Sequence, residues 1–216
     1  MGSCRRDIVG QTSALTFSVT DDTTSLTNIQ RAFQTHVFGN ISIIQALMPH
    51  WRTQQSGFLV VNSSMLSLQA QPGFGAYSAT KAALDRFVLS FAQETAMTAP
   101  GVKTLLFNPG FFRTLATNVD KVGYPKNSKH YQQLTEMYTE LSKTIEGKQP
   151  GDPVRLVNVV VDIVRGEGVA RGRKVPDFLP FGKDALTAFN GYTEAIRKIV
   201  EEWQDVIVST DFDDVQ

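Results

Sequence analysis

The chain has 216 residues, of which 42% are hydrophobic and 19% charged, and its 21 basic side chains balance 21 acidic ones. This composition argues against disorder and predicts one domain over residues 1–216. Zero formal charge gives no support for a nucleic-acid partner. The single cysteine, Cys4, excludes an internal disulfide and favours a cytoplasmic setting, and no apolar run approaches the roughly 20 residues of a membrane span. We therefore expect a small molecule or another protein as the partner.

The first third of the sequence predicts a strand, a long helix and a second strand. A β-branched and aromatic run at 14–20 predicts a short strand. Apolar residues at helical spacing from 24 to about 52 predict one long helix, which Gly39 could bend. The short apolar run at 57–62, bounded by turn residues, predicts a strand buried on both faces.

The rest of the chain continues this alternation. Helical periodicity from 76 to about 97 precedes a second apolar run at 102–107, and residues 115–150 predict a polar, partly helical excursion. Asp152 is suited to cap a helix that runs to about residue 165, with proline in its first turn. A last strand at 175–179 and a last helix from 184 to about 203 complete the pattern.

Strands that alternate with helices predict an α/β fold, Rossmann-like, with a parallel sheet between two layers of helices. Ligands of such sheets bind beyond the carboxyl ends of the strands. Ser64 follows one predicted strand and residues 108–114 follow the next. We therefore expect both segments at the ligand edge.

Tyr77 and Lys81 are four residues apart in a predicted helix, so their side chains lie one above the other. An ammonium in that position favours the phenolate and lowers a tyrosine pKa that is ordinarily about 10. The Ser64 hydroxyl, reaching the same substrate oxygen, would complete a proton-transfer site. The structural alternative is that Ser64 caps a turn, Tyr77 packs half-buried and Lys81 is solvated.

Several segments together resemble the short-chain dehydrogenase/reductase family, over roughly residues 14–213. The segments that carry the resemblance are 62–64, 72–73, 77–81 and 108–114. The resemblance implies that Tyr77 exchanges a proton with a carbonyl or alcohol, Ser64 orients that oxygen, and Lys81 binds the nicotinamide ribose of NADP or NAD. It also implies that the nicotinamide carboxamide is held by Pro109, Gly110, Phe112 and Thr114.

His36 stands where the family has an asparagine that links the lysine to solvent. A histidine donates and accepts hydrogen bonds and ordinarily titrates near neutrality, so His36 could relay protons in its place. The alternative is that relaxed selection allowed the asparagine to drift.

The family's glycine-rich turn, Gly-x-x-x-Gly-x-Gly, is absent from these 216 residues, as is its Asn-Asn-Ala-Gly segment. That turn holds the cofactor pyrophosphate against a helix N-terminus. We therefore expect a Rossmann-like domain that lacks its first βαβ portion and binds the nucleotide weakly.

Three functions remain open at this point. The chain could be an oxidoreductase that interconverts a ketone or aldehyde and an alcohol. It could instead be a non-catalytic relative that binds or dimerises, as a homo-oligomer or with an intact paralogue through the helices that carry His36 and Tyr77. The third is a cofactor-independent isomerase or cyclase. Aromatic residues suggest an apolar or aromatic substrate, although such residues are as often core: Phe111, Phe112, Tyr124, Tyr131 and Tyr138.

Overall fold

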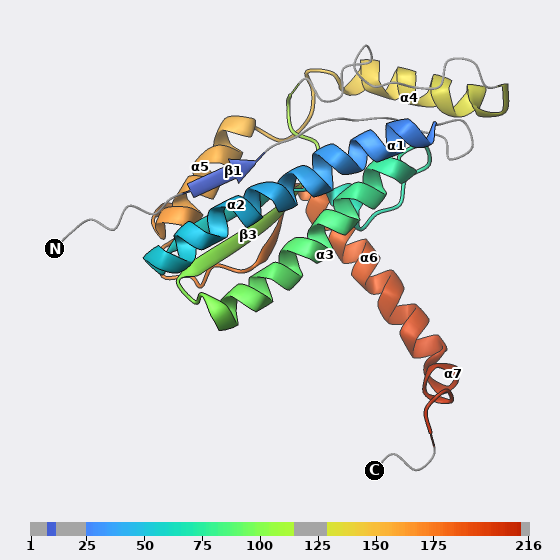
Figure 1. The fold of residues 1–216 in the computed structure, drawn as a ribbon. Helices are drawn as coiled ribbons and strands as arrows, with labels where there is room; N and C mark the ends of the chain where they lie inside the picture. Colours follow the sequence, from blue (N-terminus) through green and yellow to red (C-terminus); the bar gives the residue numbers. More distant parts are fainter. Residues whose placement is uncertain (1–7, 12–24, 115–128, 213–216) are drawn as a thin grey trace.

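The computed structural model describes residues 8–11, 25–114 and 129–212, and within them a parallel sheet lies between two helical layers (Figure 1). The strands occur in chain order across the sheet: β1 (Ile8–Gln11), β2 (Gly57–Asn62), β3 (Val102–Pro109) and β4 (Phe178–Phe181). Every neighbouring pair is parallel. The predicted α/β class is confirmed. The strand expected at 14–20 lies outside the described residues.

β2 is buried on both faces, as its apolar run predicted. Leu59 and Val61 pack into the cluster beneath α2 (Gly39–Gln54) and α3 (Gly75–Thr98). Phe58 and Val60 point to the opposite face. This strict alternation follows from the period of two along a strand. Burying one such side chain contributes about 1.5–3 kcal/mol.

The opposite face of the sheet is covered by α5 (Pro153–Arg165). Ile163 and Val164 of this helix are buried against the Phe58 side of β2. The Asp152 side chain accepts hydrogen bonds from the backbone N–H groups of Val154 and Arg155, which confirms the predicted cap. Gly166 ends the helix at φ 70°, a left-handed conformation that glycine adopts without strain.

The long helix predicted from 24 to about 52 is continuous but not uniform. It comprises α1 (Leu26–Phe33), a π-helical turn, η1 (Gln34–Phe38), and α2, with Ser25 as the N-terminal cap. The N–H of Gly39 donates to the carbonyl of Gln34, five residues earlier. Gly39 itself keeps α-helical angles, so the irregularity is an enlarged turn rather than a bend at the glycine.

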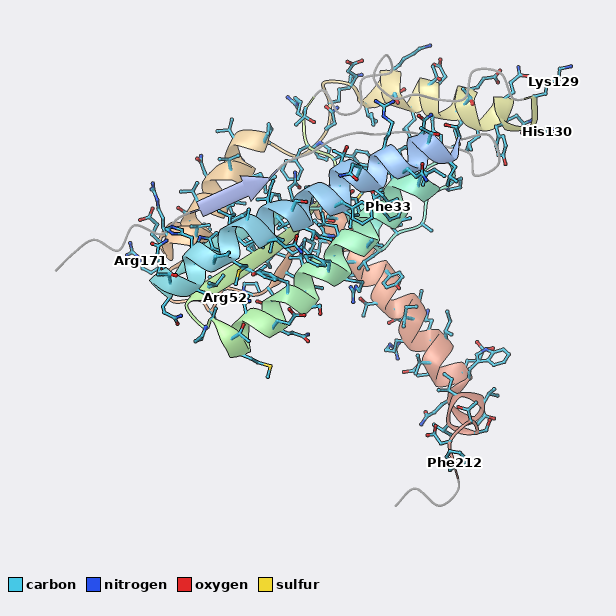
Figure 2. The ribbon with its side chains drawn as sticks, viewed as in Figure 1. Phe33, Arg52, Lys129, His130, Arg171 and Phe212 are labelled. Carbon is cyan, nitrogen blue, oxygen red and sulfur yellow. The ribbon has the colours of Figure 1, made fainter. Side chains whose placement is uncertain are left out.

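The remaining elements lie between β2 and the C-terminus. These are η2 (Met65–Ser67), η4 (Lys129–Tyr131), α4 (Gln132–Ile145), η5 (Gly168–Ala170), α6 (Lys183–Glu202) and α7 (Gln204–Val208). β4 lies three residues later than expected because it pairs with the end of β3, Leu106 against Phe178. Figure 1 shows α6 and α7 projecting from the body, and Figure 2 shows Phe212 beyond α7. None of the described helices is long and apolar enough to cross a membrane.

Candidate active site

The carboxyl ends of β2 and β3 meet at one edge of the sheet. Asn62 pairs with Phe107, and the N–H of Ser63 donates to the carbonyl of Phe107 over 2.8 Å. Ser64 therefore leaves β2 beside the point at which Asn108 and Pro109 end β3. The prediction that these two segments share an edge is confirmed.

Ser64 has two roles in the structure. Its backbone is extended (φ −160°, ψ 151°), and its hydroxyl caps η2 by accepting from the N–H of Leu66 at 3.2 Å. The same side chain also acts on Tyr77, where it opposes the rise in the phenol pKa. The capping interpretation and the functional interpretation of this serine are thus compatible.

Tyr77 and Lys81 lie in the first two turns of α3. The Lys81 ammonium is 5.8 Å from the centre of the Tyr77 ring and donates to the carbonyl of Asn62 over 3.2 Å. Lys81 is only 2% exposed, so the alternative of a solvated lysine is wrong. Burial lowers its pKa to about 8, although the charge of Asp85 acts in the opposite direction.

The pKa of the Tyr77 phenol does not follow the expectation that the Lys81 ammonium would lower it. Its pKa is raised, chiefly because burial penalises the phenolate, with the negative charge of Asp85 adding to the rise. The side chain of Ser64 acts the other way and is outweighed. Helical spacing correctly places a cation nearby, but the depth of burial decides the sign. Tyr77 is therefore a protonated phenol at neutral pH in this structure.

His36 lies within the π-helical turn and is fully buried. Its ring meets that of Tyr77 edge to face at 5.6 Å, and its Nδ1 is 2.8 Å from the Thr80 hydroxyl. That hydroxyl donates to the carbonyl of Tyr77 at 2.7 Å. It therefore accepts from His36, which assigns the Nδ1–H tautomer by hydrogen-bond geometry.

The expected titration of His36 near neutrality is wrong. Burial, reinforced by the charge of Lys81, lowers its pKa to about 4. The imidazole is neutral at neutral pH, and any part that it has in proton transfer uses the neutral ring. Asn40 supports this turn from within, since its side-chain N–H donates to the carbonyl of His36 over 2.7 Å.

The turn after β3 carries the four residues that the resemblance assigns to the cofactor. Pro109, Gly110 and Phe112 are half-buried and Thr114 is exposed. The N–H of Gly110 donates to Phe181 of β4 at 2.9 Å, while Phe112 bridges to Gly151. This segment is therefore held by the neighbouring strand at the same edge as Ser64.

The sequence interpretation missed Asp184 as a support of this turn. The N–H of Phe111 donates to the Asp184 carboxylate at 2.5 Å. A Cβ added to Gly110 would lie 2.2 Å from that carboxylate, so a larger residue here would displace the Asp184 side chain. An acidic residue in the first turn of α6 was visible in the sequence, but its contact with residue 111 is a tertiary one.

Asn108 and Asp85 were also missed. The side-chain N–H₂ of Asn108 lies 2.9 Å from the carbonyl of Ser64, 2.7 Å from the Ser67 hydroxyl and 2.8 Å from Asp85. Asn108 is fully buried and Asp85 is 2% exposed. The available signal was that Asp85 continues the four-residue spacing of Tyr77 and Lys81 along α3.

The family model for short chain dehydrogenases matches residues 7–122, which is more than half of the chain. The chain therefore belongs to the short-chain dehydrogenase family. The oxidoreductase BOA17 of Botryotinia fuckeliana is 25% identical over 82% of this chain. This chain spans only 61% of that relative's length.

Two solved structures are similar to this chain in fold. A short-chain dehydrogenase from Streptomyces avermitilis has a TM-score of 0.78 and 28% identity, and the match covers 95% of this chain and 71% of that one. A short chain dehydrogenase from Burkholderia cenocepacia, solved in complex with NADP, has a TM-score of 0.63 and 15% identity, with 91% and 68% covered. The second likeness concerns the fold alone.

Proposed function

We propose that the chain is an oxidoreductase that interconverts a ketone or aldehyde and an alcohol with NADP or NAD, and that Tyr77 is its acid and base. One observation carries the proposal. The Lys81 ammonium lies 5.8 Å from the centre of the Tyr77 ring, and the side chain of Ser64 acts to lower the pKa of that phenol, at the carboxyl edge of a parallel sheet. This edge is where such folds bind ligands.

The role of Tyr77 in proton transfer follows from the protonation state of its phenol. In the direction of reduction, the protonated Tyr77 donates to the substrate oxygen, and the Ser64 hydroxyl donates a second hydrogen bond to that oxygen. Lys81 stabilises the phenolate that remains. His36 is neutral, and it steadies the start of α3 through Thr80.

The residues present fit the nicotinamide end of a dinucleotide. Lys81 supplies a buried cation for the ribose hydroxyls, and the turn that carries Pro109, Gly110, Phe112 and Thr114 would hold the carboxamide. When bound, the cofactor supplies or accepts the hydride. The sequence printed here contains no glycine-rich turn for the pyrophosphate.

An apolar or aromatic substrate suits the surroundings of Tyr77. The tyrosine packs in one cluster with Phe74 and Phe111. Phe74 meets Tyr138 of α4 edge to face at 5.3 Å, and the Tyr138 hydroxyl donates to the carbonyl of Pro72. Tyr131 is half-buried, whereas Tyr124 lies outside the described residues. Aromatic side chains thus border the proposed proton donor.

A nucleotide titration tests the proposal. The purified chain is titrated with NADPH and with NADH while nicotinamide fluorescence is followed, and turnover is measured on a panel of aromatic ketones. We expect saturable binding, and we expect Tyr77→Phe to lower turnover by about 10²–10⁴-fold while binding persists. Tyr192→Phe, at an exposed tyrosine of α6, is the matched control. A folded chain that binds neither nucleotide contradicts the proposal.

A binding or dimerisation module is the second candidate, because the arm formed by α6 and α7 exposes a row of apolar side chains. These are Leu186, Tyr192, Ile196, Ile199, Val200, Trp203, Val206, Ile207 and Val208. Exposed apolar patches mark interaction surfaces. Sedimentation would then give a homodimer, or a complex with an intact paralogue, without nucleotide binding. Tyr77-dependent conversion in the absence of nucleotide would instead support an isomerase or cyclase.

A further inference from the structure

Asp85 is a carboxylate in the interior of the body, on the same face of α3 as the proposed site. It follows Lys81 by one helical turn and Tyr77 by two, and it is 2% exposed. Burying a carboxylate is costly unless hydrogen bonds and opposite charge favour it. An apolar side chain would fill this position at lower cost, so the carboxylate calls for a reason other than packing.

Asn108 connects Asp85 to the loop that carries Ser64. Its side-chain N–H₂ lies 2.8 Å from Oδ2 of Asp85 and 2.9 Å from the carbonyl of Ser64. It also lies 2.7 Å from the hydroxyl of Ser67, in η2. Displacing the carboxylate would therefore displace an amide that holds the backbone of Ser64.

The second connection is electrostatic and reaches the two other members of the site. The charge of Asp85 opposes the effect of burial on the pKa of Lys81, which is lowered to about 8, and it adds to the rise in the pKa of Tyr77. His36 is the remaining titratable group that interacts with Lys81 in the part of the chain that the structure describes. Because His36 is neutral at neutral pH, Asp85 is the counter-charge of Lys81.

We propose that Asp85 is a positioning residue of the proton-transfer site: through Asn108 it fixes the backbone of Ser64, and through its charge it keeps Lys81 cationic. The role in turnover rests on the proposed function. The effect on Lys81 is a property of the folded chain and can be measured without any nucleotide.

Burial raises the pKa of Asp85 itself, and hydrogen bonds from the surrounding side chains, with the charge of Lys81, act against that rise. Ser67 is one of these partners. Ser67→Ala therefore removes a hydrogen bond from the same network without removing its charge. Asp85→Asn keeps the shape and removes the charge, so the two variants separate packing from electrostatics.

The experiment is an NMR titration of the chain that carries ¹³C-labelled lysine, with Lys81→Arg used to assign the Lys81 signal. In the unmodified chain we expect the Lys81 midpoint at about pH 8. We expect the charged fraction at pH 8 to fall in Asp85→Asn and to stay unchanged in Ser67→Ala. A Lys81 midpoint that is unchanged or raised in folded Asp85→Asn overturns the proposal.

A second measurement uses no variant, so it does not depend on whether a substituted chain folds. In the unmodified chain with ¹³C-labelled aspartate, the Asp85 carboxyl signal should show an inflection at the Lys81 midpoint, because the two charges interact. Its absence also overturns the proposal.

Turnover then tests the link to function. The alkaline limb of the pH profile should move to lower pH in Asp85→Asn and stay in place in Ser67→Ala. An alkaline limb that stays in place in Asp85→Asn overturns the link. An unmodified chain without turnover contradicts the proposed function, while the NMR result stands by itself.

Discussion

α3 and α6 are helices of similar length that have opposite surroundings. α3 has 24 residues and buries polar side chains, among them Lys81 and Asp85. α6 has 20 residues, and of these only Ala185 is buried, while Ile196 and Ile199 are exposed. One helix thus holds charges in the interior and the other presents apolar groups to solvent.

The two helices show two unfavourable placements of side chains, namely charged groups in the interior and apolar groups in solvent. The buried charges of α3 have hydrogen-bond partners within the chain: Lys81 donates to the carbonyl of Asn62, and Asp85 accepts from the side chain of Asn108. The apolar side chains on the outer part of α6 gain no burial from the body, because only the first turns pack there, against Met65 and Leu66. Amphipathic spacing therefore predicts a helix without saying what its apolar face contacts.

The largest effect is expected in the interior face of α3. Leu84 is 1% exposed in the cluster between α3 and the sheet. Leu84→Ala should lower the free energy of unfolding by about 2–5 kcal/mol, because it removes apolar contacts and leaves a cavity. Urea denaturation measures the change. A loss below about 1 kcal/mol would mean that this face of α3 is less tightly packed than the structure has it.

A pH dependence of stability should follow from His36, which packs against the start of α3. Its pKa is about 4 in the folded chain and 6.5 ordinarily, so the unfolded chain binds the proton first as pH falls. Stability should therefore be lost between pH 6.5 and pH 4, by about 3 kcal/mol from this group.

The variant His36→Asn removes the imidazole and should flatten this part of the curve. Unfolding is measured at several pH values for both chains, and the difference between the two curves isolates the histidine. Parallel curves between pH 4 and 6.5 would contradict the buried, neutral state of His36.

The junction between the body and α6 should be sensitive to a single methyl group. Gly110→Ala would bring a Cβ to 2.2 Å from the Asp184 carboxylate. We expect a loss of about 1–3 kcal/mol, as for other overpacked sites. The variant Asp184→Ala should relieve part of that loss, so that the double variant is less destabilised than the sum of the single ones. Strict additivity would show that the two residues do not touch.

The smallest effect is expected on the outer part of α6. Ile199 is 53% exposed, and Ile199→Ala should change the stability of the monomer by no more than about 0.5 kcal/mol. The measurement is repeated over a range of protein concentrations. A larger loss that grows with concentration would show that a second chain covers this helix.

The sequence predicted the elements whose patterns are local. β2 was an apolar run between turns, and α5 had its cap at Asp152. β1 was missed because Ile8–Gln11 is too short for a period, and its pairing with β2 decides its conformation. The shift of β4 has the same cause, since its partner residues in β3 set its limits.

In the candidate site, too, local patterns predicted some features, and contacts between distant segments decided the others. Helical spacing brought Tyr77 and Lys81 together, and the position of Ser64 after a predicted strand placed it at the same edge of the sheet. The supporting roles of Asp85 and Asp184 depend on contacts between distant parts of the chain. The direction of the Tyr77 pKa shift and the size of the His36 shift also could not be predicted, because burial of a side chain is a tertiary property.

The π-helical turn at Gln34–Phe38 has a consequence for how this chain tolerates insertions and deletions. A turn closed over five residues holds one residue more than an α-helical turn, so it offsets the phase of α1 from that of α2 by about 100°. Deleting one residue there would restore a regular helix and leave the side chains of α1 facing as they do now, because the enlarged turn absorbs the extra residue. A one-residue deletion within α1 itself would instead turn the residues before it by about 100° about the helix axis.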